Sequence, residues 1–239
     1  MDRPRGDGVE ELQAALATHQ AKRQVGVGRM DADGAPDSIF RRKKNLVLYK
    51  GNGPGGLTSV TIGCNGAVRG GGIAGTGRVG VAGSIVAGNR ADRSRQCDGE
   101  LRSAGDNVDH GHRCGFDQAT DLEDTDPMLR RLGPYGGPTP TMALSVHSAA
   151  VDLAGSCGGR DQRGAPRDQR CDAGAYEIVR CLGQPVNIVG TPGDDELSGG
   201  RGPDTFLGLG GNDEFQGSIG TDRACGGSGD DLLIAGPGD

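Results

Sequence analysis

The pattern of apolar positions divides the chain into a stretch of short strands and a C-terminal stretch with a strict period. In residues 57–62 (LTSVTI) and 79–89 (VGVAGSIVAGN), small or β-branched side chains alternate with polar residues or glycine, which predicts strands with alternately inward side chains. Asn65 and Asn89 follow these runs 24 residues apart, about one coil of a parallel β-helix, and asparagine tolerates the left-handed corner of a coil. We therefore predict a parallel β-helix segment in residues 51–180.

From Gly190 onward the chain divides into nonapeptides without a slip. Position eight is apolar in each of them: Leu197, Phe206, Phe215, Ala224 and Leu233. Glycine fills positions one and four, at Gly190, Gly193, Gly199, Gly202, Gly208, Gly211, Gly217, Gly220, Gly226 and Gly229. Aspartate fills position six, at Asp195, Asp204, Asp213, Asp222 and Asp231. The period predicts a solenoid whose turns are alike and whose position-eight side chains form its core.

The turn formed by positions one to six has the chemistry of a calcium site. Glycine permits positive φ and the close approach of neighbouring turns, and such a turn aims backbone carbonyls at a common point. The aspartate adds a charged, hard oxygen ligand. Calcium takes six to eight oxygens at about 2.3–2.6 Å, which stacked turns of this kind can supply.

This GGxGxDxUx pattern resembles the RTX, or hemolysin-type, calcium-binding nonapeptide repeat. The resemblance implies a parallel β-roll over residues 190–239, with Ca²⁺ as its cofactor and successive turns on alternate sides. An ion then lies between turns n and n+2, which pairs Asp195 with Asp213, Asp213 with Asp231, and Asp204 with Asp222. Because stacked carboxylates repel one another, the roll is expected to fold only with calcium.

A second resemblance covers residues 57–177. It is carried by SIVAGN (84–89), CDG (97–99), LRSAGDNV (101–108), DLEDTDPML (121–129), GGPTPTMAL (136–144), HSAAVD (147–152), DQRG (161–164) and CDAGAYE (171–177). These motifs, in this order, are similar to the closing coils of the bacterial right-handed parallel β-helix surface proteins called choice-of-anchor Q. The resemblance implies an extracellular β-helix, and the molecular activity of the family is mostly unassigned. The chain departs from it in having only about two coils, and residues 1–50 match nothing in it.

Composition agrees with solenoids and not with one thick core. The chain has 47 glycines, no tryptophan and 3% aromatic residues. Of the formal charge of −6, residues 190–239 carry −8, and acids at fixed spacing suggest a cation partner. Scattered basic residues with almost no aromatics exclude a nucleic-acid surface. Residues 1–50 stay unassigned, as disorder or a short helix at 9–23, and the basic run at 41–44 is read as solvated surface.

Seven cysteines in loop-rich sequence, without a CxxC pair, favour disulfides and an oxidising compartment over a zinc site. We predict that Cys97 pairs with Cys114 and Cys157 with Cys171, because each pair closes a short loop. The odd number leaves one thiol, Cys64 or Cys225. No secretory signal and no membrane-spanning stretch is visible, so disulfides without a signal suggest a fragment or a misassigned start.

Three further clusters are interpreted as structural. His110 and His112 are read as a polar loop, the acids at 121–126 as a solvated turn before Pro127, and Asp161 with Arg163 as a buried pair that closes the solenoid. No catalytic motif is present, so we predict an all-β calcium-binding protein, secreted or at the cell surface, with a scaffolding or adhesion role and a polysaccharide or protein as further partner. The alternative is a fragment of a secreted polysaccharide lyase or epimerase that carries a calcium-binding module.

Overall fold

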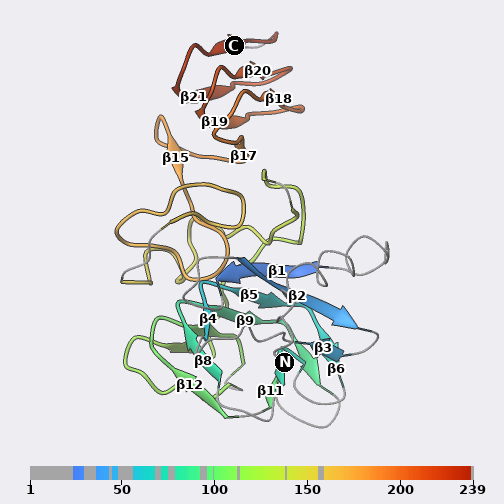
Figure 1. Cartoon of the computed structure of the whole chain (residues 1–239), viewed down its shortest axis with the longest axis vertical. Helices are drawn as coiled ribbons and strands as arrows, with labels where there is room; N and C mark the ends of the chain where they lie inside the picture. Colours follow the sequence, from blue (N-terminus) through green and yellow to red (C-terminus); the bar gives the residue numbers. More distant parts are fainter. Residues whose placement is uncertain are drawn as a thin grey trace, which may run out of the picture.

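The computed structural model describes residues 24–29, 36–42, 45–47, 56–67, 71–74, 79–91, 96–98, 100–111, 114–137, 139–155 and 159–237. These residues form strands and irregular loops, with no helix among them, so the predicted all-β class is confirmed. In Figure 1 the chain runs from a β-helix through a loop-rich middle region to a β-roll. Within the described part of the chain, no helix is long and apolar enough to cross a membrane.

The β-helix is built from parallel strands one coil apart. Its strands are β4 (Leu57–Thr58), β5 (Thr61–Gly63), β6 (Gly66–Ala67), β7 (Ile73–Ala74), β8 (Val79–Ala82), β9 (Ile85–Ala87), β10 (Arg90–Ala91), β11 (Cys97–Asp98), β12 (Leu101–Ser103), β13 (Val108–Asp109) and β14 (Leu122–Glu123). Leu57 pairs with Val81 and Thr61 with Ile85, which is the predicted spacing of 24 residues. The neighbouring strands form the series β12-β8-β4, β14-β13-β9-β5, β10-β6 and β11-β7.

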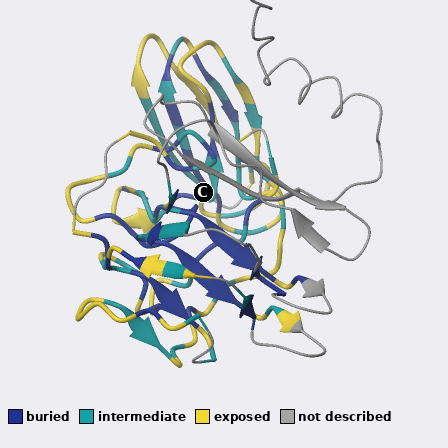
Figure 2. Cartoon of the chain, turned by 60° about the horizontal axis from the view of Figure 1, so that its bottom comes forward, coloured by how far each residue is buried: buried dark blue, intermediate teal, exposed yellow. Residues whose placement is uncertain are grey.

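The aliphatic side chains that predicted these strands form the core of the coils. Leu57, Val60, Ile62, Ile73, Val81 and Val86 are buried in one cluster, closed by Phe116 and by the disulfide between Cys97 and Cys114. In Figure 2 the buried residues, in dark blue, concentrate on the stacked strands. The coils are thin, so each strand contributes only one or two side chains, and small aliphatic residues are sufficient to fill the interior.

The corners of the coils differ in one respect from the sequence prediction. The left-handed residues are Cys64, with φ of 56°, and Gly88, with φ of 65°, whereas Asn65 and Asn89 follow them in ordinary conformations. The two asparagines instead stack. Asn65 donates to Asn89 Oδ1 from its backbone N at 3.0 Å and from Nδ2 at 2.9 Å, and Asn89 Nδ2 donates to the Ile62 carbonyl. Their amides therefore satisfy backbone groups between coils.

Three antiparallel strands precede the first coil, in a region that the sequence left unassigned. They are β1 (Gln24–Arg29), β2 (Pro36–Arg42) and β3 (Asn45–Val47), and β1 pairs with β4 through Arg29 and Thr58. The β-helix sheet thus continues as β12-β8-β4-β1-β2-β3. The helix predicted at 9–23 lies outside the described residues.

The middle region, residues 124–179, has isolated β-bridges but no strand among its described residues, and it packs on the β5-β9-β13-β14 sheet. Ala143, Ala150, Ala173 and Tyr176 bury against Ile85, among others, and the Ala175 N–H donates to Thr61 Oγ1 at 2.9 Å. Small side chains and close backbone contact replace strand pairing here.

Two buried ion pairs hold the middle region together. Arg163 Nε lies 2.9 Å from Asp161 Oδ2, both side chains are fully buried, and the Arg163 guanidinium lies 3.7 Å from the centre of the Tyr176 ring. This confirms the structural interpretation of Asp161 and Arg163. Arg167 Nη1 lies 2.9 Å from Glu177 Oε2. Burial and the neighbouring carboxylate of Asp172 raise the pKa of Glu177 to about 7, although Arg167 opposes that shift.

The roll consists of two parallel three-stranded sheets, β17-β19-β21 and β18-β20-β22. Their strands are β17 (Ile188–Val189), β18 (Glu196–Ser198), β19 (Thr205–Gly210), β20 (Glu214–Gln216), β21 (Arg223–Ser228) and β22 (Leu232–Ile234), preceded by the hairpin of β15 (Arg180–Cys181) and β16 (Gln184–Pro185). Phe206 and Phe215 are fully buried between the sheets, with ring centroids 5.6 Å apart. The prediction that position eight forms the core therefore holds for Phe206 and Phe215, whereas Leu197 and Ala224 are half-buried and Leu233 is 47% exposed.

The disulfides agree with the sequence prediction in part. Cys97 pairs with Cys114, and Cys64 is free and exposed. Cys171 is disulfide-bonded, but Cys157 lies outside the described residues, so that pairing stays a prediction. Cys225 is not a leftover thiol, because it pairs with Cys181. The β15-β16 hairpin folds back onto the roll, where Cys181, Val186 and Val189 are buried beside Leu207 and Cys225, and this return brings the two cysteines together.

Candidate calcium site

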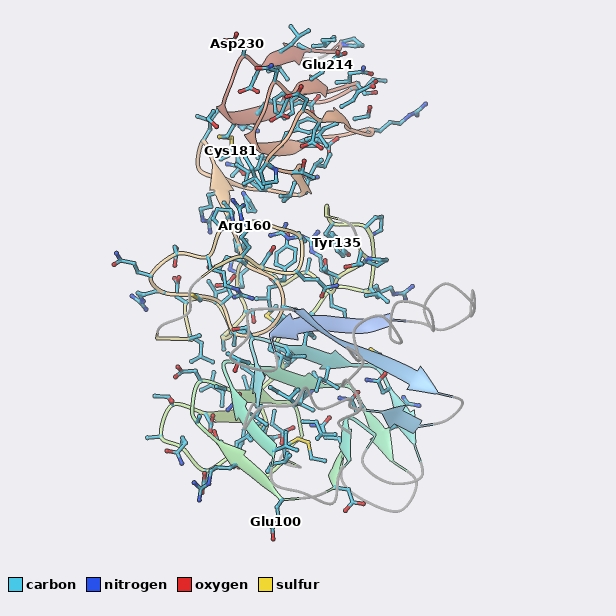
Figure 3. All side chains as sticks on the ribbon, viewed as in Figure 1. Glu100, Tyr135, Arg160, Cys181, Glu214 and Asp230 are labelled. Carbon is cyan, nitrogen blue, oxygen red and sulfur yellow. A yellow bond between two sulfur atoms is a disulfide. The ribbon has the colours of Figure 1, made fainter. Side chains whose placement is uncertain are left out.

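The nonapeptide turns stack along two edges of the roll. The three-turn edge consists of turns 190–195, 208–213 and 226–231, and the two-turn edge consists of turns 199–204 and 217–222. The strand register fixes this arrangement, because Glu196 pairs with Glu214 and Thr205 with Arg223, in each case 18 residues on. Figure 3 shows the side chains of the roll, with Glu214 and Asp230 labelled. Successive nonapeptides therefore alternate between the two edges.

The position-six aspartates form one column on each edge. On the three-turn edge the Asp195 N–H donates to Asp213 Oδ1 at 3.0 Å, and the Asp213 N–H donates to Asp231 Oδ1 at 3.0 Å. On the two-turn edge the Asp204 N–H donates to Asp222 Oδ1 at 2.8 Å. These are the three pairs that the sequence predicts to flank calcium ions. One carboxylate oxygen of each pair thus links two turns, and the other oxygen points into its own turn.

The position-one glycines lie where that second oxygen points. A Cβ atom placed on Gly190 would lie 2.6 Å from Asp195 Oδ2 and 2.9 Å from the Gly208 carbonyl oxygen. The same environment recurs at Gly199, with Asp204 Oδ2 at 2.5 Å and the Gly217 carbonyl at 2.7 Å, and again at Gly208, Gly217 and Gly226. Only glycine leaves this space open, and the space is lined by a carboxylate oxygen and, at Gly190, Gly199 and Gly208, by a carbonyl oxygen of the next turn as well.

The position-four glycines have a different role, which is conformational. Gly202, Gly211, Gly220 and Gly229 have positive φ, from 99° to 149°, whereas Gly193 in the first turn does not. A Cβ on Gly211 would also fall within 2.7 Å of the Gly193 carbonyl oxygen. The repeat therefore needs glycine at position one for space and at position four for the turn itself.

Asp213 is the most unusual of the aspartates. It is 2% exposed, and within the described structure its Oδ2 has no hydrogen-bond partner. Burial raises the pKa of Asp213, and the negative charges of Asp195, Asp231 and Asp194 raise it further. A buried, unpaired carboxylate oxygen costs a few kcal/mol unless a cation or proton compensates it. The donor set at this point, a carboxylate beside backbone carbonyls, fits a hard cation such as calcium.

Across the part of the chain that the structure describes, no three His, Cys, Asp or Glu side chains gather around one point that could hold a metal. The repeat geometry explains this result. Each predicted site has only two carboxylates, from turns 18 residues apart, and the remaining ligands are backbone oxygens. The roles of the five aspartates and their glycines as calcium ligands therefore remain predictions at the level of single residues.

Asn187 was missed by the sequence analysis. It lies at the start of the two-turn edge, where its Oδ1 accepts the Thr205 N–H at 2.7 Å and its Nδ2 donates to Asp204 Oδ1 at 2.7 Å. The signal was present, because residues 181–189 are in phase with the repeats and have Ile188 at position eight. Val186 replaces the aspartate of position six, which hid this degenerate repeat from a search for the full pattern.

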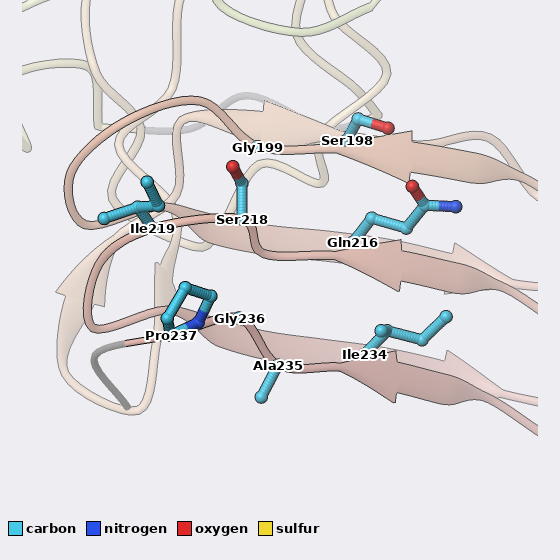
Figure 4. Close-up of a pocket in the computed structure, with 9 residues that line it drawn as sticks. All are labelled: Ser198, Gly199, Gln216, Ser218, Ile219, Ile234, Ala235, Gly236 and Pro237. Carbon is cyan, nitrogen blue, oxygen red and sulfur yellow. The ribbon is translucent and has the colours of Figure 1, made fainter.

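The other polar clusters take structural positions. Asp121 accepts hydrogen bonds from the Asn107 N–H and Nδ2 and from Ser103 Oγ, and so anchors one coil to the next. His110 is exposed, and His112 lies outside the described residues. A groove beside the two-turn edge is lined by Gln216, Ile219 and Ile234 with other residues, and no carboxylate lines it (Figure 4). Gly199, the position-one glycine beside Asp204 Oδ2, also lines it, so the groove adjoins the two-turn column at this glycine.

Comparison with known proteins identifies a family for the C-terminal repeats and not for the rest of the chain. The family model described as "RTX calcium-binding nonapeptide repeat (4 copies)" matches residues 189–224 and 216–239. No curated protein and no solved structure matches the chain. Residues 189–239 are about a fifth of the sequence, so the match describes the roll alone. The C-terminal part of this β-solenoid thus carries RTX calcium-binding nonapeptide repeats, and Ca²⁺ is the ion that this family binds.

Proposed function

We propose that this protein is a secreted or cell-surface β-solenoid in which Ca²⁺ bridges alternate turns of the C-terminal roll. Asp195, Asp213 and Asp231 hold two ions on the three-turn edge, and Asp204 and Asp222 hold one on the two-turn edge. The observation that carries this proposal is Asp213, whose buried Oδ2 lacks a partner in the described structure and lies beside a glycine cradle rimmed by the Gly226 carbonyl. The glycines of positions one and four complete each site by leaving the carbonyls accessible.

Bound calcium neutralises the negative charge of the aspartate columns. The carboxylates of one edge are held in register by their own hydrogen bonds, so their mutual repulsion is fixed by the fold. A divalent cation between two of them removes that repulsion and satisfies the oxygen that points into the turn. Folding of the roll is then coupled to calcium, because the ligands come from turns that are adjacent only in the folded chain.

The proposed setting is extracellular. Two disulfides, Cys97–Cys114 and Cys181–Cys225, and a third that involves Cys171, are typical of an oxidising compartment. Calcium is about millimolar outside cells, where extracellular modules bind it with dissociation constants on the order of 10⁻⁴–10⁻³ M. We propose a scaffolding or adhesion role at the surface of a bacterium. We further propose that the β-helix end segment predicted over residues 51–180 is related to the choice-of-anchor Q group. In this proposal the segment offers a rigid surface to a polysaccharide or protein partner.

Isothermal titration of the full-length protein with calcium tests the proposal. We expect about three ions per chain, no comparable heat with magnesium, and loss of binding when all five position-six aspartates are replaced by asparagine. Asp117→Asn with Asp124→Asn is the control, because these residues are acidic and exposed but lie outside the roll. Absence of calcium binding to the wild-type protein at millimolar concentrations would refute the proposal.

A further inference from the structure

The two edges of the roll differ in charge. Positions five to seven of the three-turn edge hold seven acidic residues and no basic one: Asp194, Asp195, Glu196, Asp213, Glu214, Asp230 and Asp231. The same positions of the two-turn edge hold two acids, Asp204 and Asp222, and one base, Arg223, and a second base, Arg201, lies at position three. The nonapeptide pattern does not distinguish the edges, since both have glycine and aspartate at the required positions.

A second column of polar side chains strengthens the field of the three-turn edge. The Asn212 N–H donates to Asp194 Oδ1 at 2.7 Å, and the Asp230 N–H donates to Asn212 Oδ1 at 2.8 Å. Position five is therefore stacked as well, with the opposite hydrogen-bond direction to position six, and Asp194 and Asp230 lie at the two ends of its column. On the two-turn edge position five is Pro203 and Thr221, which add no charge.

The first turn of the two-turn edge is satisfied by the protein itself. The Asn187 amide donates to Asp204 Oδ1, and the Gly200 N–H donates to Asp204 Oδ2 at 2.7 Å, so both oxygens of this carboxylate have donors. The sheet that leads from this edge is also fixed, because Cys181 is bonded to Cys225 and the β15-β16 hairpin packs beside Leu207. In the first turn of the three-turn edge, Asp195 Oδ2 likewise accepts hydrogen bonds from the Thr191 N–H and from Thr191 Oγ1. The Asn187 amide and the disulfide are therefore what distinguish the two-turn edge.

We infer that the two edges bind calcium at different concentrations, the three-turn edge first and the two-turn edge later. The inference rests on the proposed calcium sites and adds the residues that set their affinity: Glu196, Glu214, Asp194 and Asp230 strengthen binding on one edge, and Arg201, Arg223 and Asn187 weaken it on the other. The charges of these side chains, partly screened by salt, separate the two affinities by on the order of tenfold.

Calcium titration of the full-length protein, by calorimetry at low and at high salt, tests this inference. Two classes of sites are expected, two ions that bind more tightly and one that binds more weakly, and the gap should narrow as salt is raised. Arg201→Gln with Arg223→Gln should tighten the weak class about threefold and leave the tight class unchanged. Glu196→Gln with Glu214→Gln, the matched pair on the other edge, should weaken only the tight class by a similar factor.

The outcomes separate this inference from the proposed function. If the wild-type protein binds no calcium, the proposed function fails. If it binds three ions in a single class, and the arginine and glutamate variants change nothing, the sites are present but the edges are equivalent, and the inference is overturned. Asn187→Leu gives a second measure, because removing the amide that occupies Asp204 should strengthen the weak class, and weaker binding in this variant would also contradict it.

Discussion

In both the β-helix and the roll, side-chain oxygens accept backbone N–H groups of a neighbouring coil. These side chains are neutral asparagines in the β-helix and negatively charged aspartates in the roll. In the β-helix, the Ser84 N–H donates to Asn107 Oδ1 at 3.0 Å, and the Asn65 N–H donates to Asn89 Oδ1. In the roll, the Asp195 N–H donates to Asp213 Oδ1 at the same distance. Both are polar ladders in which a side-chain oxygen of one coil accepts the backbone N–H of the preceding one. The amide ladder is complete in itself, whereas the carboxylate ladder accumulates negative charge.

This difference explains why the roll requires a cation and the β-helix does not. The second atom of each asparagine amide is a donor, and Asn107 Nδ2 donates to the Val81 carbonyl, to Ser103 Oγ and to Asp121 Oδ1. The second atom of each aspartate is another acceptor, and Asp213 Oδ2 has no donor in the described structure. The β-helix therefore closes its corners with its own groups, and the roll needs a cation.

Removing calcium should give the largest effect, and it should be confined to the roll. With chelator present, we expect β18, β20 and β22 to lose protection from hydrogen exchange, because nothing then offsets the repulsion along the three-turn edge. Strands β4, β5, β8 and β9 should keep theirs. Exchange measured by mass spectrometry with calcium and with chelator provides the check. Equal loss in both regions, or in neither, would contradict the comparison.

Replacing Asn107 by alanine should destabilise the β-helix by about 3 kcal/mol, because it leaves several buried partners of the amide unsatisfied. Asn107 is fully buried and bonds to Val81, Ser84, Ser103 and Asp121. The loss should be the same with calcium and with chelator. Denaturant unfolding of the full chain under both conditions measures this loss of stability. Asn212→Ala is the control, because Asn212 is exposed and lies in the position-five column of the roll. A calcium-dependent loss would mean that the two regions do not act independently.

The periodic parts of this contrast could be predicted from the sequence. The spacings of 24 and nine residues repeat the same environment several times. The environment of Leu57 therefore predicts that of Val81, and the environment of Asp195 predicts that of Asp213. Single contacts could not be predicted in that way. Asn187 occupies a degenerate repeat, Cys181 meets Cys225 only because a hairpin folds back, and β1–β3 have no periodic partner. The left-handed corner was misplaced by one residue, because the asparagine that marks it is needed for the ladder.

The middle region, which has neither ladder, should respond to pH. Burial and Asp172 raise the pKa of Glu177 to about 7, from an ordinary value of 4.5. Because the folded state then holds a proton that the unfolded state releases, this contribution is fully present below about pH 4.5 and is lost as the pH rises through 7. Unfolding free energies at pH 5 and pH 8 should differ by on the order of 2 kcal/mol through this group. The difference should vanish in Glu177→Gln, and a slope that persists in this variant would assign it elsewhere.

The smallest expected effect is the most direct test of the comparison, because it converts the roll ladder into the β-helix ladder at one position. Asp213→Asn keeps the oxygen that accepts the Asp195 N–H and places an amide N–H near the Gly226 carbonyl, where Oδ2 now lies. Without calcium the variant should therefore be about 1 kcal/mol more stable than the wild-type protein. With calcium it should lose two ions, because Asp213 lies between Asp195 and Asp231, whereas Asp222→Asn should lose one. Thermal unfolding in chelator and calorimetric stoichiometry measure the two halves of this prediction. Equal losses from Asp213→Asn and Asp222→Asn would show that each aspartate serves one ion, and that the column is a row of separate turns and not a shared ladder.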